Sequence, residues 1–370
     1  MQSLVLRLGY ALVIVAIAVF TEFDQHDQLA VAQAGVAQLM YAAQDDGTIH
    51  VYDIINRHAE VQLIRAFGCC ADVRGITAAV PTQRLYVMYN RDNQGHVVAL
   101  DLPSSQVLWD RVLHSPGVDR GNVTPDGSIL YLPTWENDAE SPYELAIDAE
   151  TGAEKARIAL PPRSHDTIVS LDGQRVFMET KSETASMYIA DTSTNQVVQV
   201  LGGYCCSGVL APFAINGAAT KIVNQVNGYA GFQLADVAAG GVPEMVPFAS
   251  GYGGHGIAWT PAENQVWVND GGAALAHVFD MTAAPPRELA PVATSHPSHW
   301  LTFNIDGRFA YVAGRKGSGD LTDVIDAATY QRVGSLGPSE DLLEVDFAAG
   351  EAVAVGNQFG VGRIRPQPGG

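Results

Sequence analysis

Basic residues are scarce in this chain. Its 370 residues include 21 lysines and arginines against 40 aspartates and glutamates, which gives a formal net charge of −19. A protein with this balance repels phosphate backbones and anionic lipid surfaces. The composition therefore excludes nucleic acid as a principal partner.

Charged residues of both signs are also few, and familiar catalytic motifs are missing. Charged residues make up 16% of the chain and hydrophobic residues 47%, so there is ample material for a core and no polar excess typical of disorder. The sequence contains no G-x-S-x-G elbow, no G-x-x-x-x-G-K-[ST] loop and no H-E-x-x-H helix. A serine hydrolase is therefore disfavoured.

Long apolar runs are nearly absent. The one candidate, Leu8 to Phe20, follows Arg7; it is short for a membrane span but has the length of a signal-peptide core. Small residues around Ala34 offer a cleavage point, and an uncleaved anchor is the alternative. We therefore expect residues 1–34 to be an export signal and residues 35–370 to form one domain. The mature protein is then periplasmic or extracellular and has no membrane span.

A repeated unit runs through the rest of the chain. It consists of an apolar strand, an Asp-Gly or Asn-Gly turn, a second apolar strand, and a third strand that ends in aspartate, as in "HVYDI". Consecutive aspartates of this kind lie 43–48 residues apart. The seven are Asp53, Asp101, Asp148, Asp191, Asp236, Asp280 and Asp326.

This repeat predicts an all-β fold, a seven-bladed β-propeller with four-stranded blades. Asp/Asn-Gly pairs between apolar strands signal hairpins, and four strands in about 45 residues are typical of propeller blades. The last inner strand, near Leu342, has no aspartate-ending strand after it, whereas Asp53 precedes the first inner strand. Strands from both chain ends should therefore share one blade and close the ring. The apolar segment 359–366 is surplus to this count.

Three of the repeats resemble those of a known family. The segments "SHDTIVSLDGQRVFMET", "GGHGIAWTPAENQVWVND" and "SHWLTFNIDGRFAYVAG" are similar to repeats of YVTN-type seven-bladed β-propellers, which include YncE-like exported proteins. The resemblance covers about Leu39 to Arg365, with a loose match to the tetrapeptide that names the family. It implies the fold but no single function, since members include binding proteins and related folds include lactonases and a lyase. It implies no catalytic residue, because no motif specific to those enzymes is present.

The starts of the inner strands are the expected place of a binding site. Equivalent positions of the seven blades converge on one mouth of the central channel, where such propellers usually bind ligands. These positions are Gly75, Asp119, His165, Val209, His255, His299 and Leu342. With their neighbours they give the candidate ligand-binding residues Arg74, Asp119, Arg120, His165, His255, His299 and Trp300.

The three histidines of this set admit three roles. Imidazole is the commonest ligand of zinc and copper, so His165, His255 and His299 are candidate ligands of one divalent transition metal. They could equally form an acid/base set around an organic ligand. In YVTN-type repeats, such a histidine can instead tie one blade to the next.

Two function hypotheses follow from this arrangement. The first is an exported, monomeric propeller that binds a small molecule or a protein partner at the channel mouth. The alternative is a lactonase- or lyase-type enzyme that uses a bound metal as a Lewis acid beside a histidine base.

The four cysteines form two adjacent pairs, each just before an inner strand. Cys69 and Cys70 lie three blades from Cys205 and Cys206. An exported protein favours disulfides, and we expect each pair to form a vicinal disulfide. A bridge between the pairs would require Cα atoms within about 7 Å, and thiolate binding of a soft metal is the third alternative.

Overall fold

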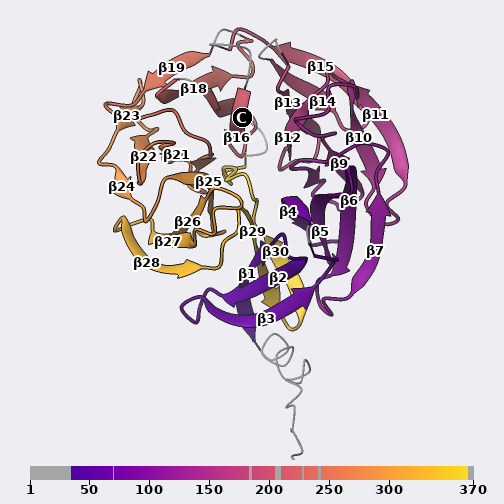
Figure 1. The fold of residues 1–370 in the computed structure, drawn as a ribbon. Coiled ribbons are helices and arrows are strands. Elements are labelled where there is room, and N and C mark those ends of the chain that lie inside the picture. Colours follow the sequence, from indigo (N-terminus) through magenta and orange to yellow (C-terminus); the bar gives the residue numbers. More distant parts are fainter. Residues whose placement is uncertain are drawn as a thin grey trace, which may run out of the picture.

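The computed structural model describes residues 35–69, 71–182, 186–204, 210–226, 229–240 and 243–365. These ranges contain strands but no helix, and accordingly no helix that could cross a membrane. The strands form seven sheets arranged in a ring (Figure 1). The predicted all-β, seven-bladed propeller is confirmed. The predicted export signal lies outside the described residues.

Six blades are built from strands that follow one another along the chain, with the first strand innermost. The first three comprise β4 (Asp72–Ala79), β5 (Arg84–Arg91), β6 (Gln94–Asp101) and β7 (Val107–Val112); β8 (Asn122–Val123), β9 (Ile129–Leu132), β10 (Tyr143–Asp148) and β11 (Glu154–Ala159); and β12 (Ser164–Val169), β13 (Arg175–Thr180), β14 (Met187–Asp191) and β15 (Gln196–Leu201). The next three comprise β16 (Leu210–Ile215), β17 (Lys221–Val226), β18 (Gly231–Asp236) and β19 (Glu244–Pro247); β20 (Ile257–Trp259), β21 (Gln265–Asn269), β22 (Leu275–Asp280), β23 (Arg287–Glu288) and β24 (Val292–Ala293); and β25 (Ser298–Phe303), β26 (Phe309–Gly314), β27 (Thr322–Asp326) and β28 (Gln331–Leu336).

The seventh blade joins the two ends of the chain. It contains β29 (Asp341–Ala348) and β30 (Glu351–Val355) together with β1 (Val36–Ala43), β2 (Thr48–Asp53) and β3 (Ala59–Arg65). β1 and β29 pair antiparallel along their full length, from Val36 opposite Ala348 to Ala43 opposite Asp341. The predicted closure is therefore present, with β30 as an additional strand.

The seven repeat aspartates make the same kind of hydrogen bond at the ends of their strands. In each case a side-chain oxygen accepts a hydrogen bond from a backbone N–H two or three residues ahead, as between Asp148 and Thr151 at 2.9 Å. This Asx turn redirects the chain toward the outermost strand. The recurring aspartate is therefore explained by local turn chemistry.

The segment after β30 occupies the end of the channel where the inner strands finish. Gln358 accepts a hydrogen bond from the backbone N–H of Ile76 at 2.9 Å and donates one to the carbonyl of Gly121 at 3.1 Å. Phe359 is 1% exposed and packs edge-on against Trp300. The surplus tail of the sequence therefore packs into one end of the channel, where a cavity of about 350 Å³ remains beside Asn357, Val361 and Arg363.

Candidate functional site

A β-bulge recurs near the start of the inner strands. In β4 and β25 the bulged residues are Arg74 and His299, which have no partner on the neighbouring strand. In β12, His165 and Asp166 together face Glu179 of β13. A bulge re-aims side chains that would otherwise alternate between the two faces of a sheet. The backbone therefore turns these charged groups toward the axis of the ring.

Arg74 is held between two carboxylates of the next blade. Its Nε donates to Asp119 Oδ1 at 2.7 Å, and its Nη2 donates to Glu136 Oε1 at 2.8 Å. The other oxygen of Glu136 accepts a hydrogen bond from Lys181 in the third blade. Burial raises the pKa of Glu136, but the charges of His165, Lys181 and Arg74 outweigh it and hold the pKa well below its usual range. Glu136 is therefore a permanent anion at the mouth.

Arg120 crosses the axis of the ring. It comes from the second blade, donates through Nη2 to Glu340 of the seventh blade at 2.9 Å, and lies 3.9 Å over the ring of Trp300 in the sixth. Its side chain is 4% exposed. Side chains therefore fill the channel at this level, and a ligand must bind at the surface of this plug.

The three predicted histidines lie next to one another. The rings of His255 and His299 stack with centres 3.8 Å apart, and the ring of His165 meets that of His255 edge-on at 6.2 Å. His299 Nδ1 donates to Glu340 Oε1 at 2.7 Å, and His255 Nδ1 donates to the carbonyl of His299 at 3.2 Å.

Their surroundings drive the pKa values of two of these histidines apart. Burial lowers the pKa of His255 well below its ordinary value, and the neighbouring His299 and Lys181 lower it further. Burial also acts to lower the pKa of His165, but the carboxylates of Asp166 and Asp119 together outweigh it, and the pKa rises to about 9. At neutral pH, His255 is a neutral imidazole and His165 is a cation.

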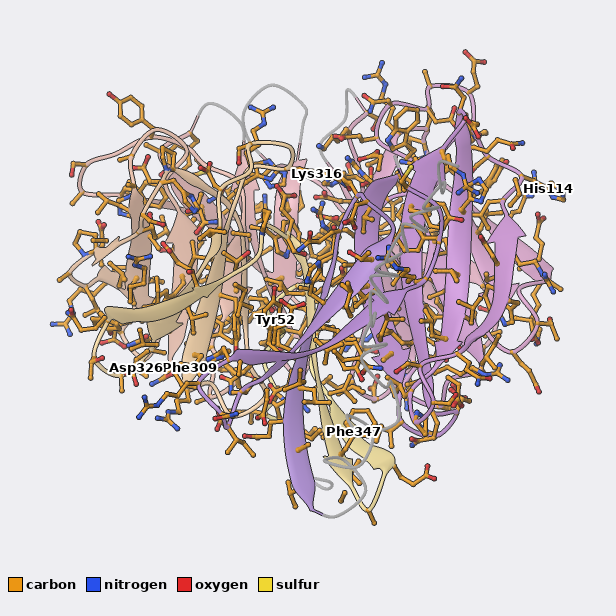
Figure 2. The ribbon with its side chains drawn as sticks, turned by 60° about the horizontal axis from the view of Figure 1, so that its bottom comes forward. Tyr52, His114, Phe309, Lys316, Asp326 and Phe347 are labelled. Carbon is orange, nitrogen blue, oxygen red and sulfur yellow. The ribbon has the colours of Figure 1, made fainter. Side chains whose placement is uncertain are left out.

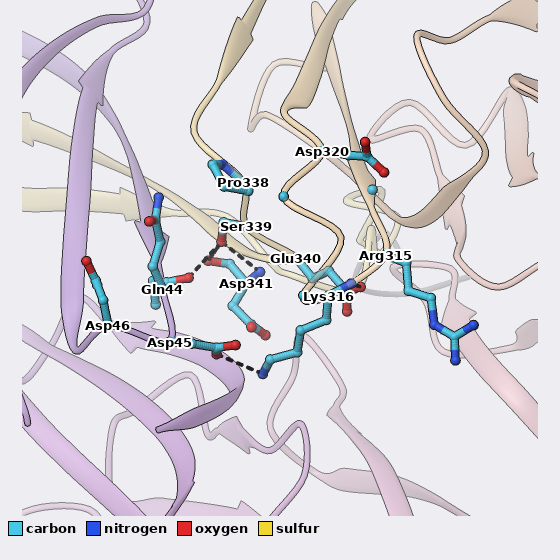
Figure 3. Close-up of a pocket in the computed structure, with 14 residues that line it drawn as sticks. Gln44, Asp45, Asp46, Arg315, Lys316, Asp320, Pro338, Ser339, Glu340 and Asp341 are labelled. Atoms are coloured by element: carbon cyan, nitrogen blue, oxygen red, sulfur yellow. Dashed lines mark hydrogen bonds and ion pairs between the residues drawn. The ribbon is translucent and has the colours of Figure 1, made fainter. Parts of the chain in front are cut away.

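A cavity of about 290 Å³ opens beside this network, between the sixth and seventh blades. Lys316 extends across it and pairs with Asp45 at 3.2 Å, whereas Arg315 points away (Figure 3). Lys316 marks the mouth end of the molecule, opposite the end where Phe347 lies (Figure 2). Glu340, which bonds both His299 and Arg120, forms part of the cavity wall and connects the cavity to the histidines.

Asp341 in the cavity wall, and Arg120, which lies next to Asp341 but does not line the cavity, each have a polar atom that lacks a hydrogen bond. Arg120 Nε and Asp341 Oδ1 lie 3.8 Å apart, and neither has a hydrogen-bond partner among the described residues. Burial raises the pKa of Asp341 to about 6, against the opposing charges of Arg120 and Lys316. The pair is separated widely enough for one polar ligand atom to bond both groups.

The structure brings the predicted ligand-binding residues into one connected network. The members of this network are Arg74, Asp119, Arg120, His165, His255, His299 and Trp300.

Two groups of three described residues could hold a metal ion. One is Asp119 with Glu136 and His165, and the other is His165 with Asp166 and Glu179. Neither contains His255 or His299, whose rings stack on each other. The geometry therefore does not favour the predicted three-histidine metal set.

The predicted disulfides stay a prediction. Cys69 is exposed, and Cys70, Cys205 and Cys206 lie outside the described residues, as does Val209 of the predicted ring.

Sequence reasoning missed four charged residues of the network: Glu136, Glu179, Lys181 and Glu340. Three of them lie at or after the end of a blade's second strand, and Glu340 lies just before β29. In an antiparallel blade, the second strand ends where the first begins, so its last residues return to the same mouth. A search at that position of each repeat would have found Glu136, Glu179 and Lys181.

Comparison with known proteins supports the fold. No model of a known protein family matches the chain, and no curated protein sequence is similar to it. Among solved structures, Kuenenia stuttgartiensis hydrazine synthase is 15% identical with a TM-score of 0.64, over 78% of this chain and 95% of that one.

Two further solved structures are similar to this chain over most of its length. The dihydro-heme d1 dehydrogenase NirN in complex with DHE is 13% identical with a TM-score of 0.60, over 86% of this chain and 72% of that one. The Cps50 (Swd1) β-propeller domain of Myceliophteria thermophila is 11% identical with a TM-score of 0.58, over 75% and 89%. At these identities the likeness shows the propeller fold alone.

Proposed function

We propose that this protein binds a small molecule carrying an amino or hydroxyl group at the open mouth of its propeller. The observation that carries the proposal is a pair of polar atoms without hydrogen bonds, Asp341 Oδ1 in the cavity wall and Arg120 Nε at 3.8 Å from it. A hydroxyl beside them can bond both, because it can accept from Nε–H and donate to Oδ1, whereas an ammonium group can donate to Asp341 alone. A buried polar atom without a hydrogen bond lowers the stability of the fold, so a ligand that supplies the missing hydrogen bonds is favoured.

The charge and size of the cavity narrow the ligand class. Its lining contains five carboxylates against two cations: Asp45, Asp46, Asp320, Glu340 and Asp341, with Arg315 and Lys316. This excess of negative charge favours an amine over an anion. A volume of about 290 Å³ suits a small metabolite better than a large cofactor or a peptide.

The first prediction concerns Asp341. Amines such as putrescine and ethanolamine should raise the melting temperature of the wild-type protein, and sugars should act more weakly. Asp341→Asn should weaken amine binding by about tenfold or more, because it removes a charge-assisted bond worth about 1.5–3 kcal/mol. Thermal shift followed by calorimetric titration measures both effects.

Asp320→Asn is the matched control, since it removes a carboxylate from the same cavity whose side chain lies apart from that of Asp341 (Figure 3). It should change amine affinity less than Asp341→Asn. Equal affinities of the wild type and Asp341→Asn would contradict the proposal.

A second candidate function is acid/base catalysis, the enzyme alternative. It is favoured by the neutral His255 lying 6.2 Å from the cationic His165. Neighbouring groups whose pKa values are driven apart can divide the roles of general base and general acid. Hydrazine synthase and a dehydrogenase among the structural neighbours show that enzymes with this fold exist.

Turnover of a panel of five- and six-membered lactones tests this candidate. If His255 is the base, His255→Gln should lower turnover about 100-fold or more, whereas His114→Gln, at a side chain 81% exposed, should leave it unchanged. A wild-type protein that hydrolyses no lactone, or a His255→Gln variant of full activity, would remove the candidate.

We further propose that the protein is exported, acts as a monomer and is related to the YVTN-type propellers. These proposals are supported by the apolar run near the N-terminus and by the repeat segments that resemble that family.

A further inference from the structure

Three buried side chains of the third blade form a group that the network of ion pairs does not complete. His165 and Asp166 lie on the bulge of β12, and Glu179 lies opposite them on β13. They are 1%, 0% and 0% exposed, respectively. His165 Nδ1 is 2.7 Å from Glu179 Oε1 and 3.3 Å from Asp166 Oδ2. The bulge thus brings one nitrogen and two carboxylates to a single point.

Most of the carboxylate oxygens at this point are unpaired. Both oxygens of Asp166 and Oε2 of Glu179 have no hydrogen-bond partner among the described residues. The nearby cations bond elsewhere, Lys181 to Glu136 and Arg120 to Glu340. Burying carboxylate oxygens without partners is strongly unfavourable. The imidazole of His165 contacts both carboxylates, so a single positive charge faces two negative ones, and a divalent ion in place of its Nδ1 proton would balance both.

The second group of possible ligands provides a contrast. It shares His165 but takes its carboxylates from Asp119 and Glu136. All four of their oxygens already accept hydrogen bonds, from Arg74, from Lys181 and from the backbone N–H of Glu136. A metal there would have to displace two cationic side chains, whereas one beside Asp166 would displace only the proton on His165 Nδ1.

The distances suit a metal ion. Donors bound to one transition metal at about 2.0–2.2 Å lie roughly 3 Å from one another, close to the separations observed here. The other ring nitrogen of His165 faces Glu136 Oε2 at 4.0 Å. This separation exceeds a hydrogen bond, so Glu136 would have to approach the ring to become the carboxylate that commonly orients a metal-binding imidazole.

We propose that His165, Asp166 and Glu179 bind one divalent transition metal ion. A set of one imidazole and two carboxylates suits Zn²⁺ or Mn²⁺ better than Mg²⁺ or Ca²⁺, which prefer oxygen ligands alone. The proposal replaces the three-histidine set with ligands from a single blade. It goes beyond amine binding at the cavity and does not depend on it.

Metal binding can be measured directly on the full-length protein. The protein is stripped with EDTA, dialysed, and titrated calorimetrically with MnCl₂ and ZnCl₂, with MgCl₂ and CaCl₂ for comparison. We expect one Mn²⁺ or Zn²⁺ per chain and a higher melting temperature with the metal. Mn²⁺ is the deciding probe, because cysteine thiolates favour softer ions and do not compete for it.

Asp166→Asn and Glu179→Gln should each weaken Mn²⁺ binding by about 100-fold or more. Mutating a residue that only hydrogen-bonds a metal ligand already lowers metal affinity by about 10–100-fold, and the loss of a ligand should cost at least as much. Glu144→Gln is the matched control: Glu144 is a buried carboxyl that bonds Ser164 and Thr167 beside the site and offers no ligand to it. Its Mn²⁺ affinity should equal that of the wild type.

The proposal is overturned if the stripped wild type binds neither ion, or if Asp166→Asn and Glu179→Gln bind Mn²⁺ as tightly as the wild type. If a variant fails to fold, the metal titration of the wild type and the shift in its melting temperature still show whether the protein binds the ion. Amine binding by the stripped protein is measured separately, so failure of the metal site and failure of the ligand site are distinguishable.

Discussion

Arg120→Met should lower the free energy of unfolding by about 3–5 kcal/mol. Arg120 is 4% exposed and is the cation that faces Glu340 and Asp341, both buried in the seventh blade. Methionine fills a similar volume but removes the guanidinium from both carboxylates, so that Glu340 keeps only its bonds from His299 and from the backbone of Lys316. Removing one member of a buried ion pair costs far more than the pair itself contributes, because the remaining charge stays desolvated.

Chemical denaturation of the purified protein measures this loss. Arg315→Met is the matched control, because Arg315 lies on the rim of the same cavity but is exposed; it should change the free energy of unfolding by no more than about 0.5 kcal/mol. The double variant Arg120→Met with Glu340→Gln should recover part of the loss, since it removes one of the stranded charges. An Arg120→Met protein within 1 kcal/mol of the wild type would show that the residue does not hold the mouth together.

The same residue bears on function as well as stability. Arg120 connects the second, sixth and seventh blades through Glu340 and Trp300, and its Nε lies 3.8 Å from Asp341 Oδ1 in the wall of the proposed ligand cavity. A ligand bonded to Arg120 and Asp341 would therefore complete a contact that spans the ring. Binding at the cavity should stabilise the closure of the propeller as a whole.

The fold was predictable because its signal is repeated. Each of the seven aspartates makes the same Asx turn, so the turn chemistry appears in the sequence at a nearly constant spacing. The closing blade followed from the offset between the two series of strands. The tail around Gln358 was not predictable, because it occurs once and its partners, Ile76 and Gly121, lie more than 230 residues away in sequence.

The candidate site was predictable only where it follows the repeat. His165, His255 and His299 occupy one register, and the structure places their rings in contact. The partners that set their chemistry, such as Glu340 and Glu179, lie outside that register. Asp166 lies next to His165 in sequence, and an ordinary strand would point it to the opposite face; the bulge that turns it inward leaves no mark in the apolar pattern.

The stability of this protein should decrease as pH rises from about 5 to 8, and Glu144 should account for much of the decrease. Glu144 is fully buried on β10, where Thr167 and Ser164 donate to it at 2.6 and 3.1 Å. Burial raises its pKa to about 8, and the two hydroxyl donors only partly oppose this.

The direction of this pH dependence follows from the difference in the pKa of Glu144 between the folded and the unfolded protein. The pKa of Glu144 is higher in the folded protein than in the unfolded chain, so folding favours the protonated form. Its contribution to stability is therefore complete below about pH 4.5 and is lost as pH rises through about 8. Glu344, whose pKa burial also raises to about 8, and Asp341 act in the same direction. Burial lowers the pKa values of His255 and His58, which opposes this loss below about pH 6.5, so the wild-type profile should slope downward most steeply between about pH 6.5 and 8.

Glu144→Gln removes this ionisation while keeping the shape of the side chain. Its free energy of unfolding should match the wild type at pH 5 and exceed it by on the order of 3 kcal/mol at pH 8. Urea denaturation at several pH values measures the difference. Glu150→Gln, at a side chain 78% exposed in the same blade, should leave the pH profile unchanged. A Glu144→Gln profile parallel to that of the wild type would mean that Glu144 stays ionised in the folded protein, and that the blade contains a cation or water network able to stabilise it.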